Sequence, residues 1–172
     1  MRGWPGSGKS TLAKKIATHF YKKGQPAFIA SADNYFTDPV TGKYDWRKEE
    51  IDVAHRYCKS VFREAVNMGQ VVIVDNTNLQ RKYYEYYVNY AKAYGYKVFQ
   101  ALPTTVWQHD IEACQKYTVE SGHSVPLATI RSMQRDFEQD DGLGLFDFPS
   151  EPEDNRGDTT GSQQQTSRSQ RT

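Results

Sequence analysis

The sequence predicts an α/β domain in which a parallel sheet is flanked by helices. Short apolar segments of strand length alternate with longer segments of helical composition along the chain, which is typical of parallel sheets. A glycine-rich segment, GWPGSGKS over residues 3–10, directly precedes the first helical segment. A glycine-rich loop that opens a helix is the arrangement with which proteins hold nucleotide phosphates. We therefore expect the fold of a phosphate-loop NTPase.

The expected elements follow in order from periodicity and composition. The first helix is expected over residues 10–23, where Leu12, Ile16 and Phe20 recur at intervals of four. The segment VVIV over residues 71–74 is β-branched and wholly apolar, which predicts a strand buried on both faces. Further helices are expected over residues 48–67, 83–94, 105–117 and 126–139, and further strands over 27–30 and 97–102.

Only Met1 and Arg2 precede the glycine-rich segment. A phosphate loop ordinarily connects a buried strand to a helix. We therefore expect the first strand of this sheet to be missing or truncated in the sequence. Such a loss would expose apolar surface on the neighbouring strands and weaken the support of the loop.

The composition of the chain changes near Phe148. Residues 150–172 contain no branched aliphatic or aromatic side chain, so they cannot bury enough apolar surface to offset the entropy of ordering them. We expect one phosphate-loop kinase-like domain over residues 1–148 and a disordered tail over residues 149–172. A domain of this size is large enough for one core.

Charge and composition exclude several classes of protein. Lys and Arg number 22 against 21 Asp and Glu, giving a net charge of +1, so any nucleic acid would have to be held by a local patch. No apolar run approaches the roughly 18 residues of a membrane span. The two cysteines are too few for a disulfide framework. We expect a cytoplasmic or nuclear protein without a membrane partner; nothing in the sequence indicates a protein partner.

The glycine-rich segment matches the GxxxxGK[ST] pattern in full. Its glycines let backbone N–H groups turn inward around phosphate oxygens. Lys9 would reach the β- and γ-phosphates of ATP, and Ser10 would ligate Mg²⁺; the alternative is a chance glycine-rich turn. The candidate nucleotide-binding residues are Gly3, Gly6, Ser7, Gly8, Lys9, Ser10 and Thr11.

Polar residues follow two of the expected strands. Asp75 ends the strand over residues 71–74, where a carboxylate beside Mg²⁺ is found in phosphate-loop proteins. Thr77 and Asn78 follow at the carboxyl end of that strand, where open α/β sheets bind ligands. Asp33 follows the strand over residues 27–30 and is placed to accept a proton from an acceptor hydroxyl. The alternatives are turn or capping roles for both aspartates.

Several segments together resemble one family. They read MRGWPGSGKSTLA, SADNYF, VDNTNL, YAKAYGYKVF and VPLATIRSM. In this order they resemble the kinase domain of the polynucleotide 5′-hydroxyl kinases, and more nearly the polynucleotide-kinase-like domain of the animal Nedd-four-binding proteins. The resemblance covers about residues 1–148.

The resemblance implies roles for individual residues. Lys9 and Ser10 match the phosphate-loop pair, and Asp33 matches the base that activates the 5′-hydroxyl. Asp75 and Thr77 match the aspartate and the threonine at the end of the family's Walker B strand. Arg131 lies in the helix after the family's lid and is a candidate substrate contact.

Two positions depart from the family pattern. Phe36 stands where the phage member of the polynucleotide 5′-hydroxyl kinase family has an arginine that holds the phosphate of the acceptor. In the lid stretch over residues 114–120, Lys116 is the one cation, and Glu120 has the opposite sign. Lysine lacks the planar fork of arginine, so Lys116 is a weak replacement for a lid arginine, and phosphate-loop binding of ATP is a safer expectation than efficient transfer.

Aromatic residues and histidines offer further candidates. Tyr83, Tyr87, Tyr90 and Tyr94 recur at helical spacing, which favours a core stripe over a stacking platform for single-stranded nucleic acid. His55 is expected on the buried face of its helix. Trp107 is expected to be a packing residue.

The sequence thus favours a kinase that uses ATP and Mg²⁺ to phosphorylate a hydroxyl, with the 5′ end of a single-stranded nucleic acid as the expected acceptor. Lys9, Asp33 and Lys116 are its candidate catalytic residues. Two alternatives stay open: a catalytically weak nucleotide-binding scaffold or switch, and a kinase for a small metabolite.

Overall fold

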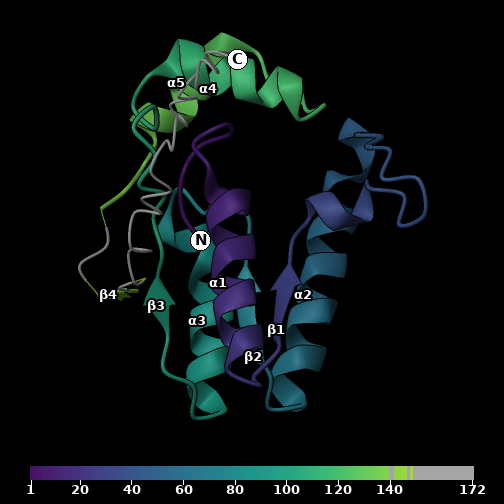
Figure 1. Cartoon of the computed structure of the whole chain (residues 1–172), viewed down its shortest axis with the longest axis vertical. Coiled ribbons are helices and arrows are strands. Elements are labelled where there is room, and N and C mark those ends of the chain that lie inside the picture. Colours follow the sequence, from purple (N-terminus) through teal and green to yellow (C-terminus); the bar gives the residue numbers. More distant parts are fainter. Residues whose placement is uncertain (140–141, 147, 149–172) are drawn as a thin grey trace, which may run out of the picture.

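The computed structural model of the chain describes residues 1–139, 142–146 and 148 (Figure 1). The expected disordered tail over residues 149–172 lies outside these residues. The described elements are, in chain order, α1 Lys9–Lys22, β1 Ala27–Ala30, the 3₁₀ turns η1 Asp33–Tyr35 and η2 Lys48–Glu50, α2 Ile51–Asn67, β2 Val71–Val74, α3 Arg81–Ala93, β3 Phe99–Gln100, α4 Ile111–Glu120, α5 Leu127–Arg135 and β4 Gly144–Leu145. Within this part of the chain, no helix combines the length and apolar character that crossing a bilayer requires.

The strands form two parallel pairs. β1 pairs with β2 in the register Ala27↔Val71 through Ala30↔Val74, and β3 pairs with β4. The alternation of side chains along β1 and β2 divides the core into two layers. Ile29 and Ile73 pack against α1 on one face, whereas Ala30 packs with α2 and α3 on the other face. The prediction of an α/β domain with parallel strands between helices is confirmed.

Met1 and Arg2 join the two strand pairs. The Met1 amino group donates to the carbonyl of Val74 at 2.8 Å, and the Arg2 amide donates to the carbonyl of Ala101 at 3.0 Å. These two residues therefore lie between β2 and β3, at the place expected for the strand that leads into the phosphate loop. Beyond them, an apolar slot of about 320 Å³ lies between the two strands and includes Val72 and Phe99 in its lining.

The Arg2 side chain is a buried hub. Its guanidinium donates to the carbonyls of Asn78 and Leu79, to the side-chain oxygen of Gln100 and to the carbonyl of Glu138. The side chain is 3% exposed. Arg2 thus ties the start of the chain to three distant segments.

Three elements differ most from their predicted ranges. The expected helix over residues 105–117 begins only at Ile111, because the Asp110 carboxylate caps it by accepting a hydrogen bond from the amide of Ala113. The strand expected over residues 97–102 is limited to Phe99–Gln100. The helix expected over residues 126–139 ends at Arg135.

The buried face of α3 differs from the predicted tyrosine stripe. Tyr84, Tyr87, Val88 and Ala91 are buried, whereas Tyr83 and Tyr94 are each 54% exposed. The stripe prediction was wrong for these two tyrosines, because Val88 and Ala91 set a buried face that begins one residue later than predicted. His55 is exposed on α2, since the buried face there is formed by Ala54, Cys58 and Phe62.

Candidate nucleotide-binding site

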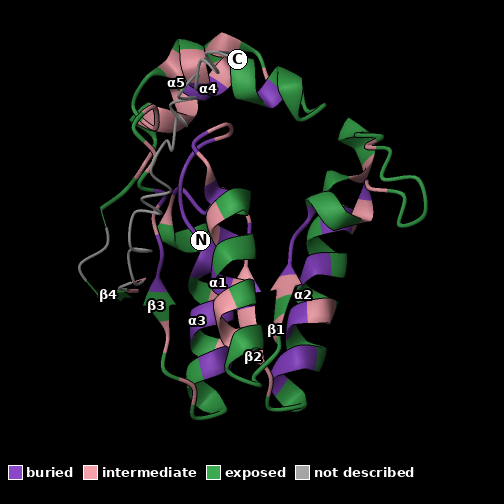
Figure 2. Cartoon of the chain, viewed as in Figure 1, coloured by how far each residue is buried: buried purple, intermediate pink, exposed green. Residues whose placement is uncertain are grey.

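The glycine-rich segment forms a loop that leads into α1. Gly6 and Gly8 have φ angles of 77° and 95°, and Gly8 is the N-cap residue of α1. Such angles favour glycine because a β-carbon makes them strained. Figure 2 shows the loop as largely buried, with Ser7 and Lys9 among its buried residues. Ser10 and Thr11 lie exposed on the first turn of α1, whose amino end favours anions.

The loop is closed on the carbonyl of Trp4. This oxygen accepts hydrogen bonds from the Ser7 hydroxyl at 2.7 Å and from the Lys9 ammonium at 2.8 Å. Burial lowers the pKa of Lys9, while the carboxylates of Asp75 and Asp33 act in the opposite direction. Lys9 is therefore held inside the loop, within the electrostatic reach of both aspartates that the sequence singled out.

The loop is supported by the segment that leads into α4. The Thr105 hydroxyl donates to the carbonyl of Ser7 at 3.0 Å, and the Trp107 indole donates to the carbonyl of Gly6 at 3.1 Å. A β-carbon on Gly6 would lie 2.0 Å from the carbonyl oxygen of Cys114. The backbone of α4 thus approaches the loop as closely as glycine allows. Trp107 packs against Tyr117, as its predicted packing role requires.

Asp75 lies at the carboxyl end of β2, beside the loop. Its amide donates to the carbonyl of Ala30, and its side chain is 7% exposed. One carboxylate oxygen, Oδ1, is buried without a hydrogen-bond partner. A buried carboxylate oxygen that lacks a hydrogen-bond donor is a suitable ligand for a hard cation such as Mg²⁺. The hydroxyl of Ser10, exposed on the first turn of α1, is a second oxygen ligand suited to such a cation. The residues present therefore fit a divalent cation.

Asn76 and Asn78 have structural contacts. The Asn76 side-chain oxygen accepts from the amide of Ala32 at 2.9 Å and so aligns the ends of β1 and β2. Asn78 has a φ of 47°, is buried, and donates from its side chain to the carbonyl of Met1 at 2.9 Å. Thr77 accepts the amide of Gly3 with its carbonyl. The substrate roles of Thr77 and Asn78 stay predictions.

Asp33 lies on η1, immediately beyond β1. Its side chain is 56% exposed and receives a hydrogen bond from the Tyr44 hydroxyl at 3.1 Å. Its second oxygen lies 3.8 Å from Nε2 of His123, in the loop between α4 and α5. The parallel register brings Asp33 and Asp75 to one edge of the sheet, as predicted from their places after two strands.

The two remaining cationic candidates pair with acids. The Lys116 ammonium lies 3.9 Å from Glu120, and its side chain is 75% exposed. Cys114 packs against the phosphate loop, and Lys116 follows it on α4 by two residues. Lys116 is therefore rotated by about 200° around the helix axis and lies on the side of α4 that is turned away from the loop. Arg131 lies 2.9 Å from the carboxylate of Glu112. The catalytic and substrate roles of Lys116 and Arg131 stay predictions.

Phe36 is a core residue. Its side chain is 3% exposed, and its ring contacts those of Tyr35 and Tyr44 edge-on. The position at which the phage pattern has an arginine is thus filled by packing in this chain. An arginine at position 36 would have to bury its charge, so Phe36 is explained by the packing of the core.

Sequence reasoning missed two residues beside Asp33. They are Tyr44 and His123, which both contact its carboxylate. The signal for His123 is its place in the Ser-Gly-His-Ser loop over residues 121–124, between two predicted helices. Its partner lies in a remote segment, and no local pattern indicates it.

Comparison with known proteins gives several relatives. The chain is 33% identical over 109 residues to NEDD4-binding protein 2 of Homo sapiens, which covers 63% of this chain and 6% of that protein. It is 27% identical over 143 residues to the 2′,3′-cyclic-nucleotide 3′-phosphodiesterase of Rattus norvegicus, covering 81% of this chain and 31% of that enzyme. It is also 29% identical over 157 residues to YLP motif-containing protein 1 of Rattus norvegicus, covering 80% and 11%. The chain thus spans less than a third of the length of each of these curated relatives.

The family described as "AAA domain" matches residues 1–139. This range holds the phosphate loop, both aspartates at the sheet edge, and helices α1 to α5. The match covers most of the chain, so the chain belongs to this family of phosphate-loop, kinase-like nucleotide-binding domains.

Proposed function

We propose that the chain is a kinase that uses Mg²⁺-ATP to phosphorylate the 5′-hydroxyl of a polynucleotide. The observation that carries the proposal is the placement of Asp33. Its exposed carboxylate lies at the same sheet edge as Asp75, and its charge acts on the buried Lys9 of the phosphate loop. A carboxylate at such a place can accept the proton of an attacking hydroxyl.

The remaining roles follow from the contacts of the loop. Lys9 would leave the carbonyl of Trp4 for the phosphate oxygens, while the loop amides bind them from the other side. Ser10 and Asp75 would hold Mg²⁺, which neutralises phosphate charge when bound. The chain itself mainly positions the reactants, as in phosphoryl transfer generally.

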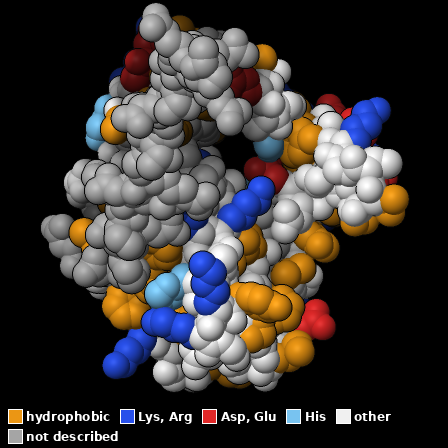
Figure 3. Space-filling view, in the orientation of Figure 1, with side chains coloured by type: hydrophobic (Ala, Val, Ile, Leu, Met, Phe, Trp, Pro, Cys, Tyr) orange, Lys and Arg blue, Asp and Glu red, His pale blue; other side chains and the backbone are white. Residues whose placement is uncertain are grey.

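A polynucleotide acceptor is supported by a local basic surface. Lys14, Lys15, Lys22 and Lys23 are exposed on or directly after α1, and Figure 3 shows Lys and Arg side chains gathered over this helix. Phosphates of a nucleic acid are held by such patches even when the net charge is close to zero. One relative carries a cyclic nucleotide in its name, which agrees with a nucleotide-related substrate.

The test follows the γ-phosphate of Mg²⁺-ATP into a single-stranded oligonucleotide with a 5′-hydroxyl. The same oligonucleotide with a 5′-phosphate controls for the acceptor group. Asp33→Asn should abolish labelling, while the matched variant Asp38→Asn, an exposed carboxylate on the same segment, should retain it. Equal labelling of the two oligonucleotides, or full activity of Asp33→Asn, would refute the proposal.

A nucleotide-binding scaffold is the second candidate, and one observation favours it. Lys116 and Arg131 both pair with carboxylates rather than facing the phosphate loop. A scaffold would bind Mg²⁺-ATP, lose that binding in Lys9→Met, and label no acceptor.

The salt dependence of acceptor binding distinguishes a small-metabolite kinase from a polynucleotide kinase, because polynucleotide binding weakens steeply with rising salt and small-substrate binding much less.

A further inference from the structure

Asp33, Tyr44 and His123 form a cluster that joins two segments distant in sequence. The Tyr44 hydroxyl donates to Oδ1 of Asp33 at 3.1 Å, and Nε2 of His123 lies 3.8 Å from Oδ2. The rings of Tyr44 and His123 also contact each other, with centroids 4.2 Å apart. Each carboxylate oxygen of Asp33 is therefore faced by a different partner, one on its own segment and one from the loop between α4 and α5. Figure 1 shows this loop and the segment before α2 approaching each other at the top of the molecule.

Tyr44 is built as a hydrogen-bond donor. Its backbone forms a bridge with Thr37, and its ring packs edge-on against Phe36. Burial and the negative charge of Asp33 raise the pKa of the Tyr44 hydroxyl well above its usual value. The hydroxyl therefore stays protonated and donates to the carboxylate at every ordinary pH.

His123 is held so that Nε2 faces the carboxylate. Its Nδ1 lies 3.1 Å from both the hydroxyl and the carbonyl oxygen of Ser121. The Ser121 hydroxyl donates to the carbonyl of Thr118 at 3.1 Å, so both Ser121 oxygens can accept from a protonated Nδ1. Nε2 is the ring nitrogen that lies near Asp33, and a ring protonated at both nitrogens presents an N–H to Oδ2.

We propose that His123 and Tyr44 are positioning residues that orient the Asp33 carboxylate for the acceptor hydroxyl. The inference rests on the proposed function, because it requires Asp33 to act as the base. His123 adds a link between the α4–α5 loop, whose helix α4 contacts the phosphate loop at Gly6, and the base itself. The position of this loop relative to the nucleotide is thereby coupled to the orientation of Asp33.

The first test needs no activity. In the full chain, the NMR signals of the His123 ring are assigned with His123→Gln. Asp33→Asn should shift these signals at constant pH, because it removes the carboxylate oxygen that lies 3.8 Å from Nε2. Asp45→Asn, which removes an exposed carboxylate from the same segment, should leave the His123 signals in place. His123 signals that do not change in Asp33→Asn would overturn the proposal.

The second test measures transfer. His123→Ala should lower kcat about tenfold, the order expected when a reacting group is misplaced. The KM for ATP should be unchanged. His123→Gln, which keeps a donor, should recover part of the rate. An active wild type with an unaffected His123→Ala variant would overturn this inference alone, whereas a wild type without transfer would remove the proposed function and the positioning role together.

Discussion

The phosphate loop and the segment that carries Asp33 meet at one site but are held in different ways. The loop is tied to remote parts of the chain, since Arg2, two residues before its Trp4, reaches partners 76 to 136 positions away. Most hydrogen bonds of the segment over residues 33–47, which we call the Asp33 arm, are local, and its remote contacts include those of Phe36 with the core and of Asp33 and Tyr44 with His123. Examples of the local contacts are the Thr37–Tyr44 bridge and the hydrogen bonds from Val40 and Thr41 to the Asp38 carboxylate.

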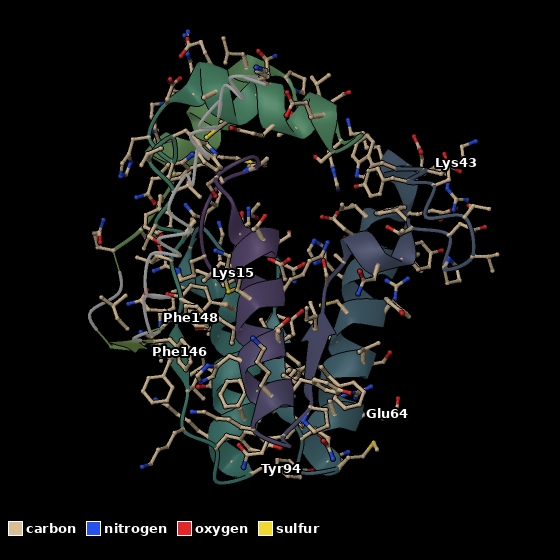
Figure 4. All side chains as sticks on the ribbon, viewed as in Figure 1. Lys15, Lys43, Glu64, Tyr94, Phe146 and Phe148 are labelled. Carbon is tan, nitrogen blue, oxygen red and sulfur yellow. The ribbon has the colours of Figure 1, made fainter. Side chains whose placement is uncertain are left out.

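The difference separates a rigid side of the site from an adaptable one. Buried, long-range hydrogen bonds open only with much of the domain, whereas exposed local ones open at low free energy. Figure 4 places Lys43 at the outer tip of the arm, away from the helices. The proposed acceptor would thus meet the site on the side that is held by the weaker, more exposed hydrogen bonds.

Breaking the Arg2 hub should have the largest effect on stability. Arg2→Met leaves several buried carbonyl oxygens without donors, each costing on the order of 1–3 kcal/mol. We expect the free energy of unfolding to fall by about 4 kcal/mol in urea denaturation. Arg63→Met, at an exposed site on α2, should change it by less than about 0.5 kcal/mol. Equal losses in the free energy of unfolding for Arg2→Met and Arg63→Met would show that the hydrogen bonds of Arg2 do not stabilise the loop.

Gly6→Ala should have the next largest effect. The added β-carbon meets the backbone of Cys114 at 2.0 Å and also strains a φ of 77°. We expect a loss of about 3 kcal/mol and much weaker nucleotide binding. Gly24→Ala is the matched control: its φ is 72° but nothing lies within 4 Å of the added carbon, so only the strain of about 1 kcal/mol should appear. Both can be measured by thermal unfolding and nucleotide titration.

In a protein that begins at Met1, as the 172-residue chain does, the amino group should make stability depend on pH. Burial lowers its pKa from 8.0 to about 6, while the charge of Asp75 opposes the shift. The unfolded chain thus binds this proton more tightly. The free energy of unfolding should therefore be highest above pH 8 and should fall by about 2–3 kcal/mol as the pH is lowered to 6 and below. Acetylation of the amine should flatten this part of the curve; parallel curves for the two forms would contradict the prediction.

On the Asp33 arm, Arg47→Gln should have the smallest effect. Arg47 pairs with Glu50 at 2.9 Å and with Asp45 at 3.8 Å, and its side chain is 50% exposed. Exposed pairs contribute between about 0.2 and 1 kcal/mol, so the loss should stay below about 1 kcal/mol and shrink in high salt. A loss comparable to that of Arg2→Met would show the arm to be as rigid as the loop.

The regular elements could be predicted from sequence because their signals are local. The helix after the phosphate loop was predicted over residues 10–23 and spans Lys9–Lys22, and VVIV forms the predicted strand Val71–Val74. The phosphate-loop glycines were predicted from their spacing. Each of these depends on neighbours within a few positions.

The missed features depend on partners far along the chain. The sequence does not show that Arg2 bonds to Gln100 and Glu138, or that His123 faces Asp33. The error on α3 arose because this helix has eight aromatic or apolar side chains, more than one face can bury, and packing against α2 determines which of them are buried. Phe36 was compared with a family pattern, whereas its burial is determined by the core that forms around it.

The slot between β2 and β3 also bears on the colloidal behaviour of the protein. In the described part of the chain, Met1 hydrogen-bonds to the end of β2 and Arg2 to the residue after β3, on the sides of these strands that face each other. The slot beyond these two residues has a mainly apolar lining. Strand edges with an apolar surround are templates for pairing with other chains. In a protein that begins at Met1, burial disfavours the charged amine that forms below about pH 6. Concentrated samples of such a chain should therefore become turbid as the pH is lowered, and more slowly when the amine is acetylated.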